Sequence, residues 1–514
     1  MKKSLTSLIL LSASLLSLAG CGDTTGSQGG SSGGTPTGPV KTIVVDGGGD
    51  ISNFQSTPTM IQSEANPYPY NTLEKLCKEW EALNPGYTVK INKTSAGGDR
   101  SVLTSQLQTK TAADIIYQNG TVVNSDLGKG WYVDLTPYLE APSKYLDGKP
   151  WKSVYDEGEL ASTQAADGKY YYCSLEKIPV AFMYNKTITT AAGVDASKIQ
   201  TFGQLLKAME AVDAYYKKDG KTDGSWATYT TTYTWYQIAM ESDMFGDLVE
   251  LGDVLRTNKM VDTEELCRLY QKGLYNPSAG VDTKNPDAST FENNRLYDYV
   301  SLINKLDQYK APATYAANNG WSLGKVAFLE ATGAQLRTFA AFDTEFEWGT
   351  ICFPDITKDD HPSAQKGVVR GSAGLATSWW VSNSAVEKGT TEACIDLLQF
   401  LTAPAQNNRL IGDLEGGLPL NPSDDYKLED YLVPLHQQYV EDIKEAKEGN
   451  RVLWGSFNSW AVLGNNYSNS FIRKMQEMDA GTTTKEQAVA TLAKLIKSTV
   501  QSYMIEYEYD TSLW

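Results

Sequence analysis

The chain has 514 residues, of which 41% are hydrophobic and 21% charged, and its formal net charge is −17. This length is more than one hydrophobic core usually serves, so we expect two domains. The acidity disfavours nucleic acid and anionic lipid as partners of the folded part, and it disfavours anionic solutes unless a local basic pocket overrides the net charge.

The N-terminus has the pattern of an export signal. Lys2 and Lys3 precede an uncharged apolar run over residues 5–20, which is too short and too interrupted for a transmembrane span. The sequence "LAGC" at 18–21 resembles the lipobox of bacterial lipoproteins, which implies cleavage before Cys21 and diacylation of its thiol; an ordinary signal with an incidental cysteine is the alternative. Residues 1–20 are then the signal peptide, and 21–40 are an acylated cysteine and a flexible Gly/Ser tether.

The first elements after the tether predict an α/β domain. Residues 41–45 are expected to form a strand, 71–83 an amphipathic helix capped by Asn71, and 87–91 a second strand. A helix over 102–110 and a strand over 113–118 follow. Alternating strands and helices are typical of a largely parallel sheet.

Three later segments predict helices with one apolar face. They are 201–212, which begins with a Thr201–Gln204 capping box, 393–401, and the last helix over 483–503, which Thr484 starts. No helix is apolar all round, so we expect no second membrane segment. Residues 281–320 are rich in Asn, Asp, Tyr and Ala, which suggests an insertion or a surface subdomain.

Cysteine and histidine are sparse. The five cysteines after Cys21 show no CxxC spacing, and their number is odd, which predicts buried thiols; one long-range disulfide is the alternative. These cysteines are Cys77, Cys173, Cys267, Cys352 and Cys394. His361 and His436 are the only histidines, so a His-rich metal site or a Ser-His-Asp triad would have to be built from one of two histidines far apart in sequence. We expect no metal and no cofactor. Tyr and Trp are abundant, which suits a protein that binds an amphipathic ligand.

Seven sequence segments, which occur in the same order as in the family, resemble bacterial extracellular solute-binding proteins of the family that includes maltodextrin-binding protein. They span residues 113–140, 166–195, 324–336, 346–356, 371–383, 393–410 and 416–423. The segment at 166–195 is similar to the family's "DGK…YYNK…AG" crossing phrase. Gly333-Ala334-Gln335 departs from the family's G-x-W, and the chain is longer than familiar members, so the identity of the ligand is not carried over.

The resemblance implies a two-lobe periplasmic-binding-protein-like fold of type II, in which each lobe is a mostly parallel sheet flanked by helices. The implied lobes are 41–176 plus 366–421 and 177–365 plus 422–514. Hinge crossings are expected near 173–179, near 354–367 and just after 416–423. The ligand would bind in the cleft between the lobes, and closure would be a hinge motion.

Ligand-binding candidates follow from these positions and from the chemistry of sugars, whose C–H faces stack on aromatic rings and whose hydroxyls bond to carboxylates, amides and guanidinium groups. The candidates are Asp46, Asn119, Glu176 and Arg370 in the first lobe, and Tyr233, Trp235, Gln335, Trp454, Phe457 and Trp460 in the second. Each also has a structural alternative in a core or loop. Trp454 is expected at a helix start, with Phe457 and Trp460 turned to the same side.

Rival functions have weaker support. A glycosidase needs two facing carboxylates, and no local motif selects a pair. "VRGSAGLA" has Arg370 in place of the first glycine of G-x-S-x-G, and "DGGGD" is not a nucleotide loop. We therefore expect a monomeric lipoprotein without enzymatic activity, on the outer face of the cell membrane, that passes a carbohydrate to an ABC transporter permease. A binding protein for a peptide, a polyamine or another polar solute is the alternative.

Overall fold

The computed structural model describes residues 39–47, 71–92, 100–218, 220, 227–230, 235–252, 255, 258–311, 317–341, 344–375, 378–413, 417–422 and 426–514. Residues 40–514 form one compact unit, and the predicted signal peptide, Cys21 and nearly all of the predicted tether lie outside the described residues. No helix of the described part is both long enough and apolar enough to cross a membrane.

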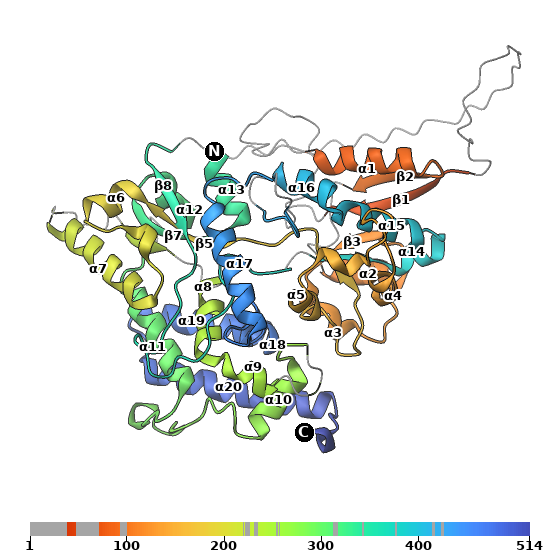
Figure 1. The fold of residues 1–514 in the computed structure, drawn as a ribbon. Coiled ribbons are helices and arrows are strands. Elements are labelled where there is room, and N and C mark those ends of the chain that lie inside the picture. Colours follow the sequence, from red (N-terminus) through yellow and green to blue (C-terminus); the bar gives the residue numbers. More distant parts are fainter. Residues whose placement is uncertain are drawn as a thin grey trace, which may run out of the picture. The chain divides into compact units, whose positions relative to one another are not determined.

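The first sheet has five strands in the order β2-β1-β3-β9-β4. Figure 1 labels β1, β2 and β3 of this sheet. They are β1 (Lys41–Asp46), β2 (Tyr87–Asn92), β3 (Ile115–Tyr117), β4 (Tyr172–Cys173) and β9 (Trp379–Val381). β1 runs parallel to β2 and β3, whereas β9 runs antiparallel to both β3 and β4. The strands predicted at 41–45, 87–91 and 113–118 are thus confirmed.

Eight helices of the described residues pack with the first sheet. They are α1 (Thr72–Leu83), α2 (Arg100–Gln108), α3 (Val123–Asp126), α4 (Thr136–Glu140), α5 (Glu157–Ala161), α14 (Asn383–Lys388), α15 (Thr391–Thr402) and α16 (Pro404–Gly412). The apolar face predicted for α1 is buried, and its Trp80 is 0% exposed. Asn71 precedes α1 as predicted, but its side chain makes no capping hydrogen bond.

The second sheet has four strands in the order β6-β7-β5-β8. They are β5 (Val180–Asn185), β6 (Ala227–Thr230), β7 (Val326–Thr332) and β8 (Trp348–Ile351). All six residues of β5 are buried, as expected of a central strand covered on both faces. β5 runs antiparallel to β7 and β8, and β6 pairs parallel with β7, so β6, β7 and β8 all run in the same direction.

The predicted α/β fold with a mostly parallel sheet in each lobe is confirmed: among the described strands, β9 is the one strand that runs against the others in the first sheet, and β5 is the one in the second. A parallel neighbour requires a crossover connection, usually through a helix. β5 instead arrives directly from the first sheet after β4, and β9 arrives from the second sheet after β8. Strands that enter from another sheet are free of the crossover rule, and they pair antiparallel with their neighbours here.

Twelve helices of the described residues pack with the second sheet or with one another beside it. They are α6 (Lys186–Ala191), α7 (Phe202–Lys218), α8 (Trp235–Phe245), α9 (Asp247–Gly252), α10 (Thr263–Gln271), α11 (Arg295–Asp307), α12 (Ala317–Ser322), α13 (Gly333–Ala341), α17 (Val433–Lys447), α18 (Ser459–Val462), α19 (Gly464–Asp479) and α20 (Lys485–Glu506). The capping box predicted for α7 is present, and Thr484 caps α20 as predicted, where Gln487 completes a second capping box. α11 packs against α8 and α20 with one face fully buried, so residues 295–307 belong to the core and not to a surface subdomain.

Three short segments between the two sheets lie side by side. Lys177 and Leu418 exchange two backbone hydrogen bonds (2.9 and 3.1 Å), and the N–H of Ala373 donates to the carbonyl oxygen of Ile178 (2.7 Å). The middle segment lies later than the predicted 354–367, because Ile356 and Ala364 still pack in the core of the second sheet. These pairings place three chain crossings next to one another.

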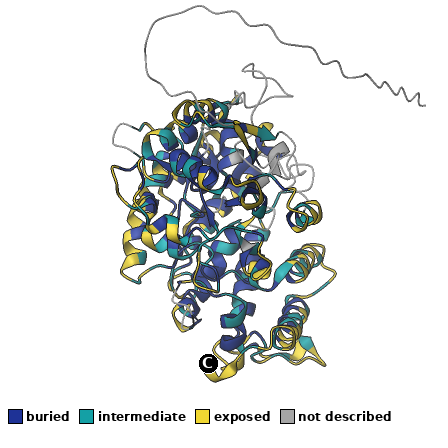
Figure 2. Cartoon of the chain, turned by 90° about the vertical axis from the view of Figure 1, so that its right-hand side faces the viewer, coloured by how far each residue is buried: buried dark blue, intermediate teal, exposed yellow. Residues whose placement is uncertain are grey.

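The cysteine thiols of the described residues lie in the packed interior and form no disulfide. All five described cysteines are free, and all but the half-buried Cys352 are buried, as the sequence predicts. Figure 2 shows buried residues in the interior and exposed residues along the outer faces of the helices.

Candidate functional site

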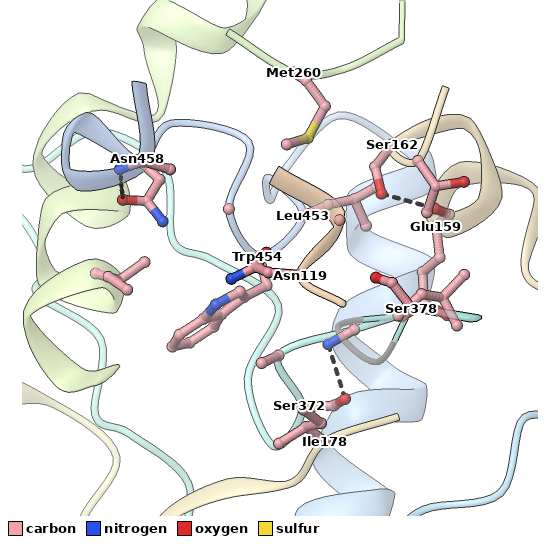
Figure 3. Close-up of a pocket in the computed structure, with 18 of the residues that line it drawn as sticks. Asn119, Glu159, Ser162, Ile178, Met260, Ser372, Ser378, Leu453, Trp454 and Asn458 are labelled. Atoms are coloured by element: carbon pink, nitrogen blue, oxygen red, sulfur yellow. Dashed lines mark hydrogen bonds between the residues drawn. The ribbon is translucent and has the colours of Figure 1, made fainter. Parts of the chain in front are cut away.

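A cavity of about 810 Å³ is lined by residues from both sheets, from the crossing segments and from residues 453–465. Part of its wall is drawn in Figure 3. This volume suits a ligand larger than a single small metabolite, since ligand pockets span roughly 300–1,000 Å³.

The first sheet contributes groups at the ends of β3 and β4. Tyr117 closes β3, Asn119 and Gly120 follow it, and Tyr172 begins β4. A Cβ atom at Gly120 would lie 2.7 Å from the hydroxyl oxygen of Tyr172 and 2.9 Å from that of Ser378. Position 120 therefore has no space for a larger residue, and the close approach brings the Asn119 amide and the hydroxyls of Tyr172 and Ser378 to one part of the wall.

Three tryptophans form an aromatic wall on the side of the second sheet. Trp235 begins α8, and its ring centroid lies 6.2 Å from that of Trp454 with the planes 34° apart. Trp454 also packs 6.2 Å from Phe353, and it lies half-buried at the cavity (Figure 3). Trp460, on α18, packs 5.1 Å from Phe471. Half-buried rings at a cavity offer one face for packing and another for a ligand.

Two buried carboxyl groups complete the wall. Glu176 is 0% exposed at the first crossing, and a Cβ atom at Gly417 would lie 2.6 Å from its Oε2 atom. The pKa of Tyr117 is raised to about 12, first by burial and then by the charge of Glu176. Glu159, on α5, is 3% exposed, and burial raises its pKa. The Nζ atom of Lys177 lies 3.6 Å from Glu159 Oε2 and opposes that shift.

Five of the predicted ligand-binding residues line this cavity: Asn119, Glu176, Trp235, Trp454 and Trp460. Asp46 is buried at the end of β1, outside the wall. Gln335 lies on α13, where its Oε1 accepts the N–H of Thr332 (3.0 Å), and Thr332 itself lines the cavity. Tyr233 and the predicted lipidation residue Cys21 lie outside the described residues.

Arg370 lies in a buried ion network instead of the cavity wall. Its Nε donates to Asp442 Oδ2 (2.9 Å), and its Nη1 lies 3.2 Å from Asp355. Arg451 pairs with the same two carboxylates, at 2.7 Å to Asp355 and 3.2 Å to Asp442. This network joins the segment before the middle crossing to α17, which gives Arg370 a structural role.

Phe457 also departs from the predicted position. The sequence predicts that a helix begins at Trp454, but α18 begins at Ser459, and Gly455 forms a turn with φ of 76° before it. Phe457 is consequently 1% exposed and stacks on Phe245, with the planes 16° apart and the centroids 5.4 Å apart. The turn separates it from Trp454 and Trp460, which reach the cavity.

Sequence reasoning missed several wall residues, among them Tyr117, Tyr172, Glu159, Ser378, Asn458 and Asn465. Tyr117 lies within the phrase at 113–140, two residues before Asn119, and Ser378 lies within the phrase at 371–383. Position at a strand end was a usable signal for Tyr117. Glu159 lies on a five-residue helix without any motif, and only the fold brings it to the cavity.

The wall can bind through ring faces, carboxylates, amides and hydroxyls. Within the described ranges, no group of three or more His, Cys, Asp or Glu side chains could hold a metal ion. The arrangement thus resembles a site for a polar ligand that also has apolar faces.

Comparisons with known proteins agree with this geometry. A search of curated proteins finds no significant match. Among solved structures, a family 1 extracellular solute-binding protein from Bifidobacterium longum subsp. infantis is similar, with a TM-score of 0.56 and 16% identity over 90% of this chain and all of that one. An ABC substrate-binding protein from Listeria monocytogenes in complex with cycloalternan has a TM-score of 0.57 and 18% identity at the same coverage. The cyclic alpha-maltosyl-1,6-maltose binding protein from Arthrobacter globiformis has a TM-score of 0.57 and 16% identity, again over 90% of this chain and all of that one.

These likenesses establish the two-lobe fold. The model of a family described as bacterial extracellular solute-binding proteins matches residues 75–425, which is more than half of the chain. The chain therefore belongs to the bacterial extracellular solute-binding proteins.

Proposed function

We propose that the protein captures an oligosaccharide in the 810 Å³ cavity and delivers it to the permease of an ABC transporter. The composition of the wall carries this proposal. Trp235, Trp454 and Trp460 offer ring faces for the C–H faces of sugars, and carboxyl, amide and hydroxyl groups are available for sugar hydroxyls. Asn119, Glu176 and these three tryptophans are the ligand-binding residues in this proposal.

The ligands of similar structures support a carbohydrate. Of the three similar structures described above, one is a complex with cycloalternan and another is a binding protein for cyclic alpha-maltosyl-1,6-maltose. A cyclic or branched glycan presents several sugar rings, and the three tryptophans could contact more than one of them.

Closure around the ligand is the second part of the proposal. We assign residues 41–176 and 372–421 to one lobe and 177–371 and 422–514 to the other, with the three adjacent crossings as the hinge; the boundary moves from the predicted 366 because the middle crossing lies at Ala373. A ligand shifts such an equilibrium only by its preference for the closed state. Binding to groups of both lobes, such as Asn119 and Trp454, provides that preference.

The N-terminus supports retention at the cell surface. Acylation of Cys21 would anchor the protein to the outer face of the membrane, and residues 22–40 would act as the tether. A monomer is sufficient for this role. No catalytic step is proposed.

A ligand screen tests the function directly. The first panel of ligands contains cycloalternan, linear maltodextrins and chitin oligosaccharides, and the second contains oligopeptides and polyamines. We expect a ligand from the first panel to raise the melting temperature of the protein. A ligand that binds only the folded state raises the melting midpoint, because it increases the free energy of unfolding by about 2.7 kcal/mol at a ligand concentration one hundred times Kd. A shift with peptides or polyamines alone would refute the carbohydrate proposal, and cleavage products from any glycan would favour an enzyme.

A further inference from the structure

A carboxyl group without an assigned role lies directly behind the aromatic wall. Glu241 is on α8, the helix that also places Trp235 and Ile238 in the cavity wall. Its side chain is 1% exposed, and it does not line the cavity itself.

Glu241 contacts the first residue of α18. The N–H of Ser459 donates to its Oε2 atom (3.0 Å), and the hydroxyl of Ser459 bonds to its Oε1 atom. Asn458, which precedes α18, accepts the N–H of Ala461 (3.2 Å; Figure 3). Asn458, Trp460 and Ala461 all line the cavity. Two side chains therefore hold the first turn of α18, and only Glu241 comes from another helix.

The surroundings of Glu241 favour its neutral form. Within the described residues, no Lys, Arg or His forms an ion pair with it. The titratable groups that face it are the buried phenols of Tyr275, Tyr299 on α11 and Tyr467 on α19, and burial raises the pKa of each. Arg295, the cation that acts on Tyr275, is paired with Asp247 at 2.6 Å.

Burial is also the main influence on Glu241. It raises the pKa of this carboxyl from 4.5 to about 7, although the two hydrogen bonds from Ser459 oppose the change. A neutral carboxyl can keep both contacts, since its O–H donates to the Ser459 hydroxyl oxygen while its C=O accepts the Ser459 N–H. The ionised form keeps the acceptor role but remains a buried charge without a cation, which is costly.

We propose that Glu241, as a neutral carboxylic acid, is the positioning residue that holds α18 against α8 and keeps Asn458 and Trp460 in the cavity wall. The inference rests on the proposed binding function of that cavity. It makes the order of the wall dependent on pH: mildly acidic conditions hold α18 in place, and alkaline conditions loosen it.

The sign and size follow from proton linkage. An opening of α18 that exposes Glu241 returns its pKa to about 4.5. The equilibrium constant for this opening therefore increases as pH rises from 4.5 to 7, and it levels off above pH 7. With these two values, the amides of residues 459–463 should lose about tenfold in hydrogen-exchange protection between pH 6 and pH 8, after correction for intrinsic exchange rates.

The matched variants are Glu241→Gln and Asp243→Asn. The Gln amide donates to the Ser459 hydroxyl and accepts its N–H as the neutral acid does, so its protection at pH 8 should equal that at pH 6. Asp243 is a buried carboxyl on the same helix that accepts the N–H groups of Ile356 and Val368. Asp243→Asn should keep the wild-type pH profile over 459–463.

The exchange measurement needs no ligand, so it separates this inference from the proposed function. A flat wild-type profile over 459–463, an unchanged profile in Glu241→Gln, or loss of the profile in Asp243→Asn would overturn the role of Glu241. Calorimetry with cycloalternan at pH 6 and pH 8 is the second arm. The inference is supported if the wild type binds more weakly at pH 8 than at pH 6 and Glu241→Gln does not. An intact exchange profile without binding of any glycan at either pH would instead refute the carbohydrate function.

Discussion

Trp454→Ala separates ligand stacking from core packing more directly than any other single change. The Trp454 ring is half-buried at the cavity, and it makes two tilted aromatic contacts, with Trp235 and with Phe353. Each such pair contributes about 0.5–1.5 kcal/mol, so we expect the free energy of unfolding to fall by about 1–3 kcal/mol. If the exposed part of the ring stacks on a sugar, removal should also cost about 2 kcal/mol of binding free energy, roughly thirtyfold in Kd.

Phe457→Ala is the matched control, three residues away in the same segment. Phe457 is 1% exposed, stacks on Phe245 and does not line the cavity. We expect a larger loss of stability, about 3–5 kcal/mol, from the cavity that its removal leaves. Binding by the folded fraction should be unchanged.

Urea denaturation and isothermal titration calorimetry measure the two quantities separately. We expect Trp454→Ala to lose more affinity for the glycan than Phe457→Ala, and Phe457→Ala to lose more stability than Trp454→Ala. Trp454→Phe should recover part of the affinity, because it keeps a ring face. An unchanged Kd in a folded Trp454→Ala protein, for a glycan that the wild type binds, would show that this ring does not contact the ligand.

Three further changes test the rest of the structure. Arg370→Ala leaves Arg451 as the remaining cation beside the buried carboxylates of Asp442 and Asp355. Urea denaturation should then show a loss of about 3 kcal/mol in the free energy of unfolding, the lower end of the range for a broken buried ion pair, while the Kd for glycan stays constant. A stable variant that no longer binds glycan would place Arg370 in the binding site. Glu176→Gln keeps the side chain's size but removes a charged acceptor, which should weaken glycan binding by about 1.5–3 kcal/mol in calorimetry; equal affinity would remove Glu176 from the ligand contacts. Cys21→Ser should release the protein from membranes or leave its signal uncut without changing Kd, and unchanged membrane attachment after cell fractionation would contradict the lipobox.

Local patterns in the sequence were enough for the helices and for much of the fold. The apolar face of α1, the capping box of α7 and the Thr484 cap of α20 involve residues three or four positions apart, and those contacts form within a helix whatever surrounds it. The phrase at 166–195 likewise predicts the direct passage from β4 to β5, because a short segment joins the two strands.

The tertiary structure decided which side chains share the cavity. Trp454, Phe457 and Trp460 have the same spacing along the chain, but the turn at Gly455 sends Phe457 into the core and leaves the two tryptophans at the wall. Arg370 meets Asp442, 72 positions away, and Glu159 reaches the cavity from a helix without any motif. Such contacts depend on how distant segments pack together, and no periodicity within one segment carries that information.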